Sequence, residues 1–306
     1  MTKHKFQGTG TALVTPFGPD GAVDEKALIR LVDFQLDAGV DMILPCGTTG
    51  EGATLETVEY ERVVSVVTER VNGRVPVIVG AGSNSTERAA KLAVRVRKLG
   101  GDGVLSVGPY YNKPTQLGFF EHFRAIALAA HIPVFVYNVP SRTGSNIEAE
   151  TILRLSEIPG IAGVKEASGD LGQVMKIIRN RPKGFRVLSG DDWAALAIVA
   201  LGGDGVVSVV ANEVPQMMRE MVDAAMEGRF DRARKLNYEI LPLMNANFIE
   251  TNPIPVKAVL AMMGLLDERY RLPLLPPSSE NRETLRGIAH DLGLLEPAEV
   301  GHGNEK

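Results

Sequence analysis

The chain contains a single cysteine, Cys46, so it forms no internal disulfide bond, which fits a reducing compartment. It has no basic excess either: the formal net charge is −4, which argues against binding to nucleic acid or to an anionic membrane surface. No apolar run reaches about 18 residues without Gly, Asp or Pro, so we expect no membrane-spanning helix. The N-terminal segment MTKHKFQGTG lacks the apolar stretch of a signal peptide. Together these absences predict a cytoplasmic protein.

Apolar material is plentiful, because 44% of the 306 residues are hydrophobic and only 23% are charged, as in ordinary globular proteins. Short apolar, β-branched segments alternate with longer segments of helical periodicity, which is typical of a parallel sheet covered by helices. The predicted strands are Thr11–Phe17, Met42–Gly47, Pro76–Gly82, Gly103–Pro109, Pro133–Val139, Ile161–Ala167, Arg186–Gly190 and Gly205–Ala211. The predicted helices follow them at about residues 25–38, 57–71, 86–99, 117–130, 148–156, 171–180, 192–201 and 214–226.

Eight such units favour a closed (β/α)8 barrel, the TIM-barrel fold, over an open sheet. An internal repeat supports closure: LGGDGVLSV at residues 99–107 recurs as LGGDGVVSV at residues 201–209, half a barrel later. After about residue 228 the strand pattern stops, and Arg229–Asn245, Pro255–Leu266 and Glu280–Leu294 are predicted helices. We therefore expect a barrel over residues 1–228 and a small C-terminal helical part over residues 229–306.

Reactive groups of such a barrel lie at the C-terminal ends of its strands. None of the five histidines is expected there: they are His4, His122, His131, His290 and His302, all in tails or helices. The rim therefore offers no imidazole, no His-based metal cluster and no Cys/His nucleophile pair. The glycine-rich segments match neither the P-loop nor the dinucleotide-binding pattern.

Two acidic residues follow the seventh predicted strand, Asp191 and Asp192. A metal site is one interpretation of this pair. We favour the other, in which an Asp pair before a helix caps the N-terminus of that helix.

Lys165 is the strongest candidate for chemistry, because it interrupts the apolar strand Ile161–Ala167. Gly163 and Ala167 share its face of the strand and leave room beside it. Burial disfavours the ammonium form and lowers the pKa of a lysine, and a neutral buried amine is a Schiff-base nucleophile. A strand-end lysine whose ammonium group reaches solvent or a carboxylate is the alternative, and this residue alone does not decide between them.

Neighbouring strand ends supply groups that suit a Schiff-base reaction. With no histidine available, tyrosine is the next candidate for proton transfer, and Tyr110, Tyr111 and Tyr137 are all at predicted strand ends. The turn Gly47-Thr48-Thr49-Gly50 presents hydroxyl and backbone N–H groups suited to a carboxylate, although it also reads as a plain strand-to-helix turn. Arg142 is placed to bind a second carboxylate, or else to lie in solvent.

Taken together, six motifs resemble the pyruvate-dependent class I aldolase family, which includes dihydrodipicolinate synthase and N-acetylneuraminate lyase. They are GTTGE at 47–51, PYYNKP at 109–114, YNVPSRTG at 137–144, GVKEASGD at 163–170, SGDD at 189–192 and NPIPVK at 252–257. The resemblance covers roughly residues 7 to 295. Because the turn is GTTGE rather than GSTGE, and because an arginine follows the strand-5 tyrosine, it favours the synthase branch over the sugar-acid lyases.

The resemblance implies roles for individual residues. Lys165 would form the imine with pyruvate and Tyr137 would transfer protons. Thr48 would link Tyr137 to Tyr111, which in this family is supplied by a neighbouring subunit. Three further residues would bind substrate: Thr49 holds the pyruvate carboxylate, Arg142 binds the carboxylate of aspartate 4-semialdehyde, and Val207 lines the pocket. The resemblance implies a homo-oligomer, either a dimer or a dimer of dimers, and neither a metal nor an organic cofactor.

The implied reaction joins pyruvate to L-aspartate 4-semialdehyde and gives 4-hydroxy-tetrahydrodipicolinate, on the route to diaminopimelate and lysine. Two alternatives stay open: a 2-keto-3-deoxy sugar acid aldolase of the same family, and a catalytically silent barrel that binds 2-oxo acids. One departure from the family bears on regulation. Lysine-inhibited members carry two histidines just after the GTTGE turn, whereas this chain has Thr57 and Tyr60. We therefore expect weak inhibition by lysine.

Overall fold

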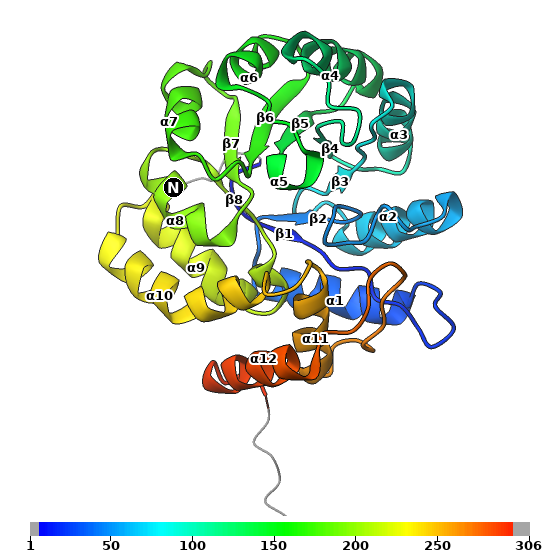
Figure 1. Cartoon of the computed structure of the whole chain (residues 1–306), viewed down its shortest axis with the longest axis vertical. Coiled ribbons are helices and arrows are strands. Elements are labelled where there is room, and N and C mark those ends of the chain that lie inside the picture. Colours follow the sequence, from blue (N-terminus) through cyan, green and yellow to red (C-terminus); the bar gives the residue numbers. More distant parts are fainter. Residues whose placement is uncertain (1–5, 296–306) are drawn as a thin grey trace, which may run out of the picture.

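Eight parallel strands, arranged as a barrel with helices outside it, form the centre of the molecule (Figure 1). The structure is a computed structural model, and it describes residues 6–295. The strands are hydrogen-bonded in the order β2-β1-β8-β7-β6-β5-β4-β3. A parallel bridge between Ile43 and Val77 joins the two ends of this order and closes the barrel. The predicted (β/α)8 fold with a C-terminal helical part is confirmed.

The strands are short and their bounds are as follows: β1 (Gly8–Ala12), β2 (Met42–Leu44), β3 (Ile78–Gly80), β4 (Gly103–Val107), β5 (Val134–Asn138), β6 (Ile161–Glu166), β7 (Arg186–Ser189) and β8 (Gly205–Ser208). The helices of the barrel are α1 (Glu25–Asp37), α2 (Thr57–Val71), α3 (Thr86–Lys98), α4 (Gln116–Ala130), α5 (Pro140–Thr143), α6 (Ala149–Ser156), α7 (Leu171–Asn180), α8 (Ala195–Ala200) and α9 (Pro215–Met226). Two 3-10 turns, η1 (Asp192–Ala194) and η2 (Val210–Asn212), follow β7 and β8.

The repeated LGGDGV segments fold in the same way, which explains why the sequence repeats. Gly100 and Gly202 follow α3 and α8 with φ of +85° and +100°, a conformation that glycine adopts at little cost. The aspartates of the two repeats each accept a backbone hydrogen bond at the preceding strand: Asp102 from Val77, just before β3, at 3.0 Å, and Asp204 from Val187 of β7 at 2.9 Å. The repeat is therefore a helix-to-strand connection that also fixes the neighbouring strand.

Alternation along the strands gives the barrel two hydrophobic layers. Residues such as Met42, Phe135 and Leu188 fill the interior. Residues on the other face of the strands, such as Val164 and Val187, pack with the surrounding helices in the largest core cluster. The side chains of Tyr137 and Lys165 lie on the inner face, near the C-terminal ends of β5 and β6.

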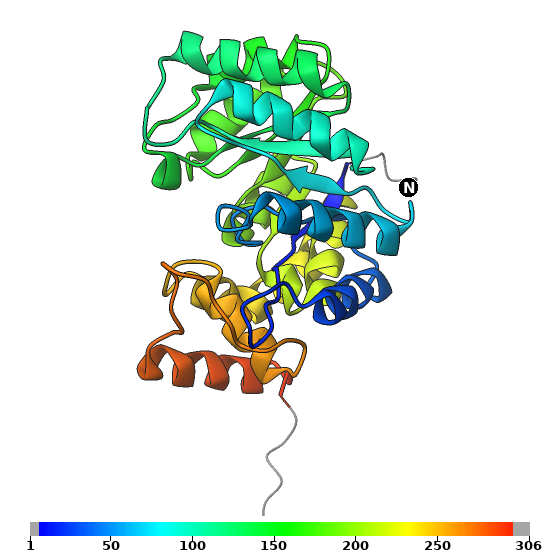
Figure 2. The same cartoon turned by 90° about the vertical axis from the view of Figure 1, so that its right-hand side faces the viewer.

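The C-terminal part consists of α10 (Phe230–Ala246), α11 (Ile254–Met262) and α12 (Ser279–Asp291). Helix α10 packs along α9, and the two share one apolar cluster that also includes residues of α11 and α12. Figures 1 and 2 show α11 and α12 beyond α1, on the opposite side of the molecule from α4 and α6. The division of the chain at residue 228 stays a prediction. Within residues 6–295, no helix is both long and apolar enough to cross a membrane.

The first strand was predicted too late in the chain, at Thr11–Phe17 instead of Gly8–Ala12. Its start is rich in glycine because β1 and β8 approach closely: a Cβ on Gly205 would lie 1.9 Å from the carbonyl oxygen of Gly8. The segment predicted as one helix over residues 192–201 is η1 followed by α8. Helix α5 was not predicted, and Arg142 lies in it rather than in an open loop. His4 and His302 lie outside the described residues.

Candidate active site

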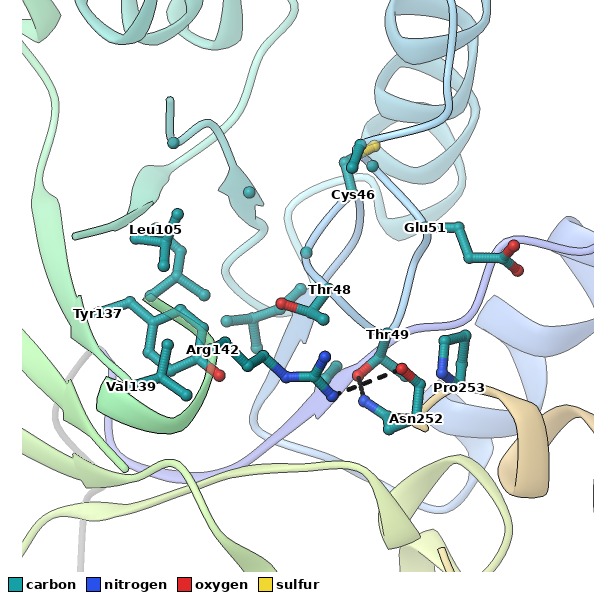
Figure 3. Close-up of a pocket in the computed structure, with 18 of the residues that line it drawn as sticks. Cys46, Thr48, Thr49, Glu51, Leu105, Tyr137, Val139, Arg142, Asn252 and Pro253 are labelled. Atoms are coloured by element: carbon teal, nitrogen blue, oxygen red, sulfur yellow. Dashed lines mark hydrogen bonds between the residues drawn. The ribbon is translucent and has the colours of Figure 1, made fainter. Parts of the chain in front are cut away.

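A cavity of about 1110 Å³ opens at the C-terminal ends of the strands. Its lining includes six of the seven residues to which the family resemblance gave roles: Thr48, Thr49, Tyr137, Arg142, Lys165 and Val207. Figure 3 shows that the residues come from separate parts of the chain, with Thr48 and Thr49 facing Tyr137 and Arg142 across the cavity. No histidine lines it within the described part of the chain, and residues 6–295 contain no group of His, Cys, Asp and Glu side chains arranged to hold a metal ion.

Lys165 lines this cavity from the inner face of β6, with only 6% of its surface exposed. Burial lowers the pKa of its amine to about 8, although the nearby carboxylates of Asp191 and Asp192 act in the opposite direction. Space for the amine comes partly from Gly190, where a Cβ would lie 3.2 Å from the Lys165 Cε. Gly163 was expected to leave room for the amine as well. A Cβ at Gly163 would instead lie 2.8 Å from the ring of Phe135, so this glycine makes room for that ring.

Tyr137 is the direct neighbour of Lys165. The two residues are paired in the register of β5 and β6, and the Lys165 Nζ lies 4.3 Å from the centroid of the Tyr137 ring. Burial raises the pKa of the phenol to about 12, while a hydrogen bond with the Thr48 side chain and the charge of Arg142 lower it. A protonated phenol beside a lysine of lowered pKa can give a proton to an intermediate and take it back.

The turn between β2 and α2 is fixed by the C-terminal part of the chain. Thr49 is 3% exposed, and its hydroxyl accepts a hydrogen bond of 2.9 Å from the Asn252 side chain. The backbone oxygen of Asn252 in turn accepts a 3.5 Å hydrogen bond from the Arg142 guanidinium (Figure 3). The arrangement places hydroxyl groups and a guanidinium cation around one cavity, which suits a substrate with more than one carboxylate.

The two aspartates after β7 do not cap a helix as we favoured. Asp191 is the residue before η1, but its side chain makes no capping hydrogen bond. Instead Asp191 lines the cavity, where burial raises the pKa of its carboxyl group, although the charges of Lys165 and Arg142 act in the opposite direction. Asp192 is buried and accepts hydrogen bonds of 3.0 and 2.9 Å from the backbone amides of Val209 and Val210. Asp192 therefore joins η1, which follows β7, to the segment that leads from β8 into η2.

Comparison with known proteins agrees with this geometry. The model of the Dihydrodipicolinate synthetase family matches residues 5–292. A 4-hydroxy-tetrahydrodipicolinate synthase of Koribacter versatilis is 51% identical over 297 residues, which cover 97% of this chain and 99% of that protein. The chain belongs to the dihydrodipicolinate synthetase family.

Solved structures of the family have the same fold over their whole length. Dihydrodipicolinate synthase from Thermotoga maritima matches with a TM-score of 0.94 and 44% identity, over 95% of this chain and 100% of that one. The chloride-inhibited dihydrodipicolinate synthase from Acinetobacter baumannii, complexed with pyruvate, matches with a TM-score of 0.93 and 43% identity, over 95% and 100% of the two chains.

Tyr111 is the one residue of the predicted family site that this chain does not bring into its own cavity. Its side chain is 90% exposed, and its backbone has a φ of +74°, in the left-handed region. Tyr111 therefore faces solvent, next in the chain to a residue that lines the cavity. The adjacent Tyr110 does line the cavity and is 41% exposed.

Three residues that line the site had no predicted role in it. Asn252 had appeared only as part of a family motif, Gly190 only as part of SGDD, and Asp191 only as a possible cap or metal ligand. No local pattern marks Asn252, because it meets Thr49 from 203 positions along the chain. For Gly190 the signal was its place after β7, at the end of the barrel that carries the reactive groups.

Proposed function

We propose that the chain is an enzyme, a lyase that condenses pyruvate with L-aspartate 4-semialdehyde and gives 4-hydroxy-tetrahydrodipicolinate through an imine at Lys165. The observation that carries this proposal is the buried Lys165 amine, of lowered pKa, in contact with the Tyr137 ring in a cavity whose lining includes Arg142. Relatives that share about half of its residues over nearly the whole chain are named as synthases of this product.

In the first half of the reaction, the neutral Lys165 amine attacks the ketone carbon of pyruvate, and loss of water leaves an imine. Thr49 and the amides of its turn hold the carboxylate of pyruvate. Loss of a methyl proton converts the imine to an enamine, which is the carbon nucleophile. In this proposal Tyr137 carries the protons, and its hydrogen bond with the Thr48 side chain supports that role.

In the second half, the enamine carbon attacks the aldehyde carbon of the semialdehyde, and the new alkoxide takes a proton. Arg142 binds the carboxylate of this second substrate, which fixes the aldehyde above the enamine. The amine of the semialdehyde then attacks the imine carbon, the ring closes, and the bond to Lys165 breaks. Val207 forms part of the wall of the cavity.

We further propose that the enzyme works in the cytoplasm as a homo-oligomer, a dimer or a dimer of dimers. Exposure of Tyr111 supports the assembly, because its hydroxyl would complete the Tyr137–Thr48 relay in a neighbouring subunit. The single cysteine, buried and unpaired, fits a reducing compartment.

Two assays test the proposal. Borohydride added with pyruvate should attach a pyruvate-derived mass to Lys165, and purified protein should condense pyruvate with the semialdehyde. Cleavage of a 2-keto-3-deoxy sugar acid without any condensation would favour the sugar-acid aldolase instead. Absence of both reactions, with pyruvate still bound, would favour the silent 2-oxo-acid-binding barrel.

A further inference from the structure

The segment Asn252-Pro-Ile-Pro-Val-Lys257 belongs to the family pattern but has no role in the reaction described so far. Two of its side chains reach from the C-terminal part to the turn at residues 47–51. Asn252 donates to the Thr49 hydroxyl at 2.9 Å, and the Lys257 Nζ donates to Glu51 Oε1 at 2.6 Å. Both contacts bridge more than 200 positions of sequence, so they couple α11 to the turn that lies between β2 and α2.

The pair of Lys257 and Glu51 is sealed from solvent, with side chains 0% and 2% exposed. Lys257 also donates to the backbone oxygen of Thr15 at 3.0 Å, and its Nζ lies 4.3 Å from the centroid of the Phe17 ring. The Thr15 hydroxyl donates in turn to the backbone oxygen of Gly50, at 2.6 Å. A buried cation with this set of acceptors tolerates little displacement, because a shift would leave a charge without a partner.

Glu51 itself has an unusual backbone, with a φ of +51° in the left-handed region that non-glycine residues seldom adopt. Such a conformation persists where the surrounding contacts determine it. The Glu51 amide donates to the backbone oxygen of Thr48 at 3.1 Å, so a contact that holds Glu51 also acts on Thr48 within the same turn. Figure 3 shows the Glu51 side chain directed away from Tyr137 and Arg142, toward the outside of the site.

We propose that Lys257 and Asn252 are positioning residues, which hold the turn so that Thr48 meets Tyr137 and Thr49 faces the substrate carboxylate. In this proposal neither side chain touches a reacting atom. The assignment of the carboxylate to pyruvate rests on the proposed function, whereas the fixing of the turn rests on the contacts alone.

The test replaces both charges at once, as Glu51→Gln with Lys257→Met, since removing one partner would strand the other charge in the interior. The matched control is Glu220→Gln with Arg232→Met, which removes an ion pair that joins α9 to α10 at 2.9 Å and has no contact with residues 47–51 or with Lys257 in the hydrogen bonds of the described residues. Each protein is examined by thermal unfolding, by deuterium uptake of the peptide covering residues 47–54, by exchange of pyruvate methyl protons in D2O, and by condensation rate.

We expect the first double variant to fold and to take up deuterium faster over residues 47–54. Methyl-proton exchange and condensation should fall together by about a hundredfold, the scale of a misplaced catalytic group, with a raised KM for pyruvate. The control should match wild type in every readout. The proposal would be overturned if the folded double variant showed the deuterium uptake and the methyl-proton exchange of the wild type. Losses of exchange and condensation in the control as large as those in the first double variant would overturn it as well.

Asn252→Ala provides an independent test should the double variant fail to fold, because it removes one uncharged hydrogen bond. It should raise the KM for pyruvate and slow methyl-proton exchange, and unchanged kinetics in that variant would also overturn the proposal. A wild-type protein that exchanges no pyruvate protons would contradict the proposed function instead. Deuterium uptake over residues 47–54 decides the role of the two residues in either case.

Discussion

Tyr137 and Lys165 are paired across β5 and β6, with the Lys165 Nζ 4.3 Å from the centroid of the Tyr137 ring, and burial acts on the two in opposite directions. It lowers the pKa of the lysine to about 8 and raises that of the tyrosine to about 12, because each loses the water that stabilises its charged form. Free lysine and free tyrosine titrate at nearly the same pH. In this pocket the amine loses its proton well before the phenol does, so a nucleophile and a proton donor coexist.

Reduction with borohydride in the presence of pyruvate should label Lys165, and Lys165→Ala should abolish both labelling and turnover. Lys257 is the matched internal control, since it is even more buried but its Nζ is held by Glu51 at 2.6 Å. Burial alone therefore does not make a lysine reactive, and Lys257 should stay unlabelled. Peptide mass spectrometry checks both sites, and labelling elsewhere with an active Lys165→Ala would remove Lys165 from the mechanism.

Tyr137→Phe should keep the fold and lose most turnover. The ring and its contact with Lys165 remain, but the hydroxyl that bonds to Thr48 is gone and no histidine of the described cavity replaces it. We expect at least about a hundredfold loss in kcat, the usual scale for a positioned acid–base group. Steady-state kinetics together with a thermal unfolding midpoint close to that of wild type would establish this, and near-normal turnover would exclude Tyr137 as the proton carrier.

The parts of the site that the sequence predicted are those that local pattern determines. Strand alternation and the strand-end rule place Lys165, Tyr137 and Thr49 at one end of the barrel without any knowledge of the fold's details. The internal repeat was recognised from its nearly identical residues, and Gly100 and Gly202 recur in it with a positive φ that few other residues adopt.

Long-range packing explains the parts that were not predicted. The late placement of β1 came from Gly8 and Gly205, whose close approach is visible only once β1 and β8 are neighbours. The capping role expected for Asp191 failed, because its side chain makes no capping hydrogen bond and instead lines the cavity, where it interacts with the charges of Lys165 and Arg142. Pairing of residue types over such distances leaves no periodic signal in a single sequence.

The pH dependence of imine formation should reveal the influence of Asp191. Lys165 must be neutral to attack, so the rate should rise with pH through its pKa of about 8. The Asp191 carboxylate raises that pKa by favouring the ammonium form. Asp191→Asn should therefore move the acid limb of the profile to lower pH, so that imine forms faster near neutral pH. Stopped-flow measurement of imine formation tests this, and a limb moved to higher pH would contradict the electrostatic assignment.

Arg142→Ala should separate the two substrates. The guanidinium is expected to bind the carboxylate of the semialdehyde, and loss of such a charge pair costs about 2–5 kcal/mol if it is well desolvated. Condensation should weaken by that amount in kcat/KM, while borohydride trapping of pyruvate changes much less. Arg142→Lys serves as the comparison, because it keeps the charge without the bidentate geometry and should recover only part of the loss. Equal losses for both substrates would place Arg142 in pyruvate binding instead.

Inhibition by L-lysine should be weak, because the two positions after the turn differ from those of lysine-sensitive relatives. Thr57 is exposed and short, and the Tyr60 hydroxyl is already used, since it donates to the backbone oxygen of Gly80 at 2.8 Å. The loss of two hydrogen bonds to a ligand costs about 1–3 kcal/mol at about 0.5–1.5 each. That corresponds to roughly one to two decades in affinity.

Titration of the condensation rate with L-lysine measures this difference, and Thr57→His provides the matched gain-of-function variant at the exposed position. We expect the wild type to stay active at lysine concentrations that inhibit a sensitive family member, and Thr57→His to shift the curve toward tighter inhibition. This expectation would fail if the Tyr60 ring packed against the methylene chain of bound L-lysine. Partial inhibition that saturates at low lysine in the wild type would show that the tyrosine ring compensates for both missing imidazoles.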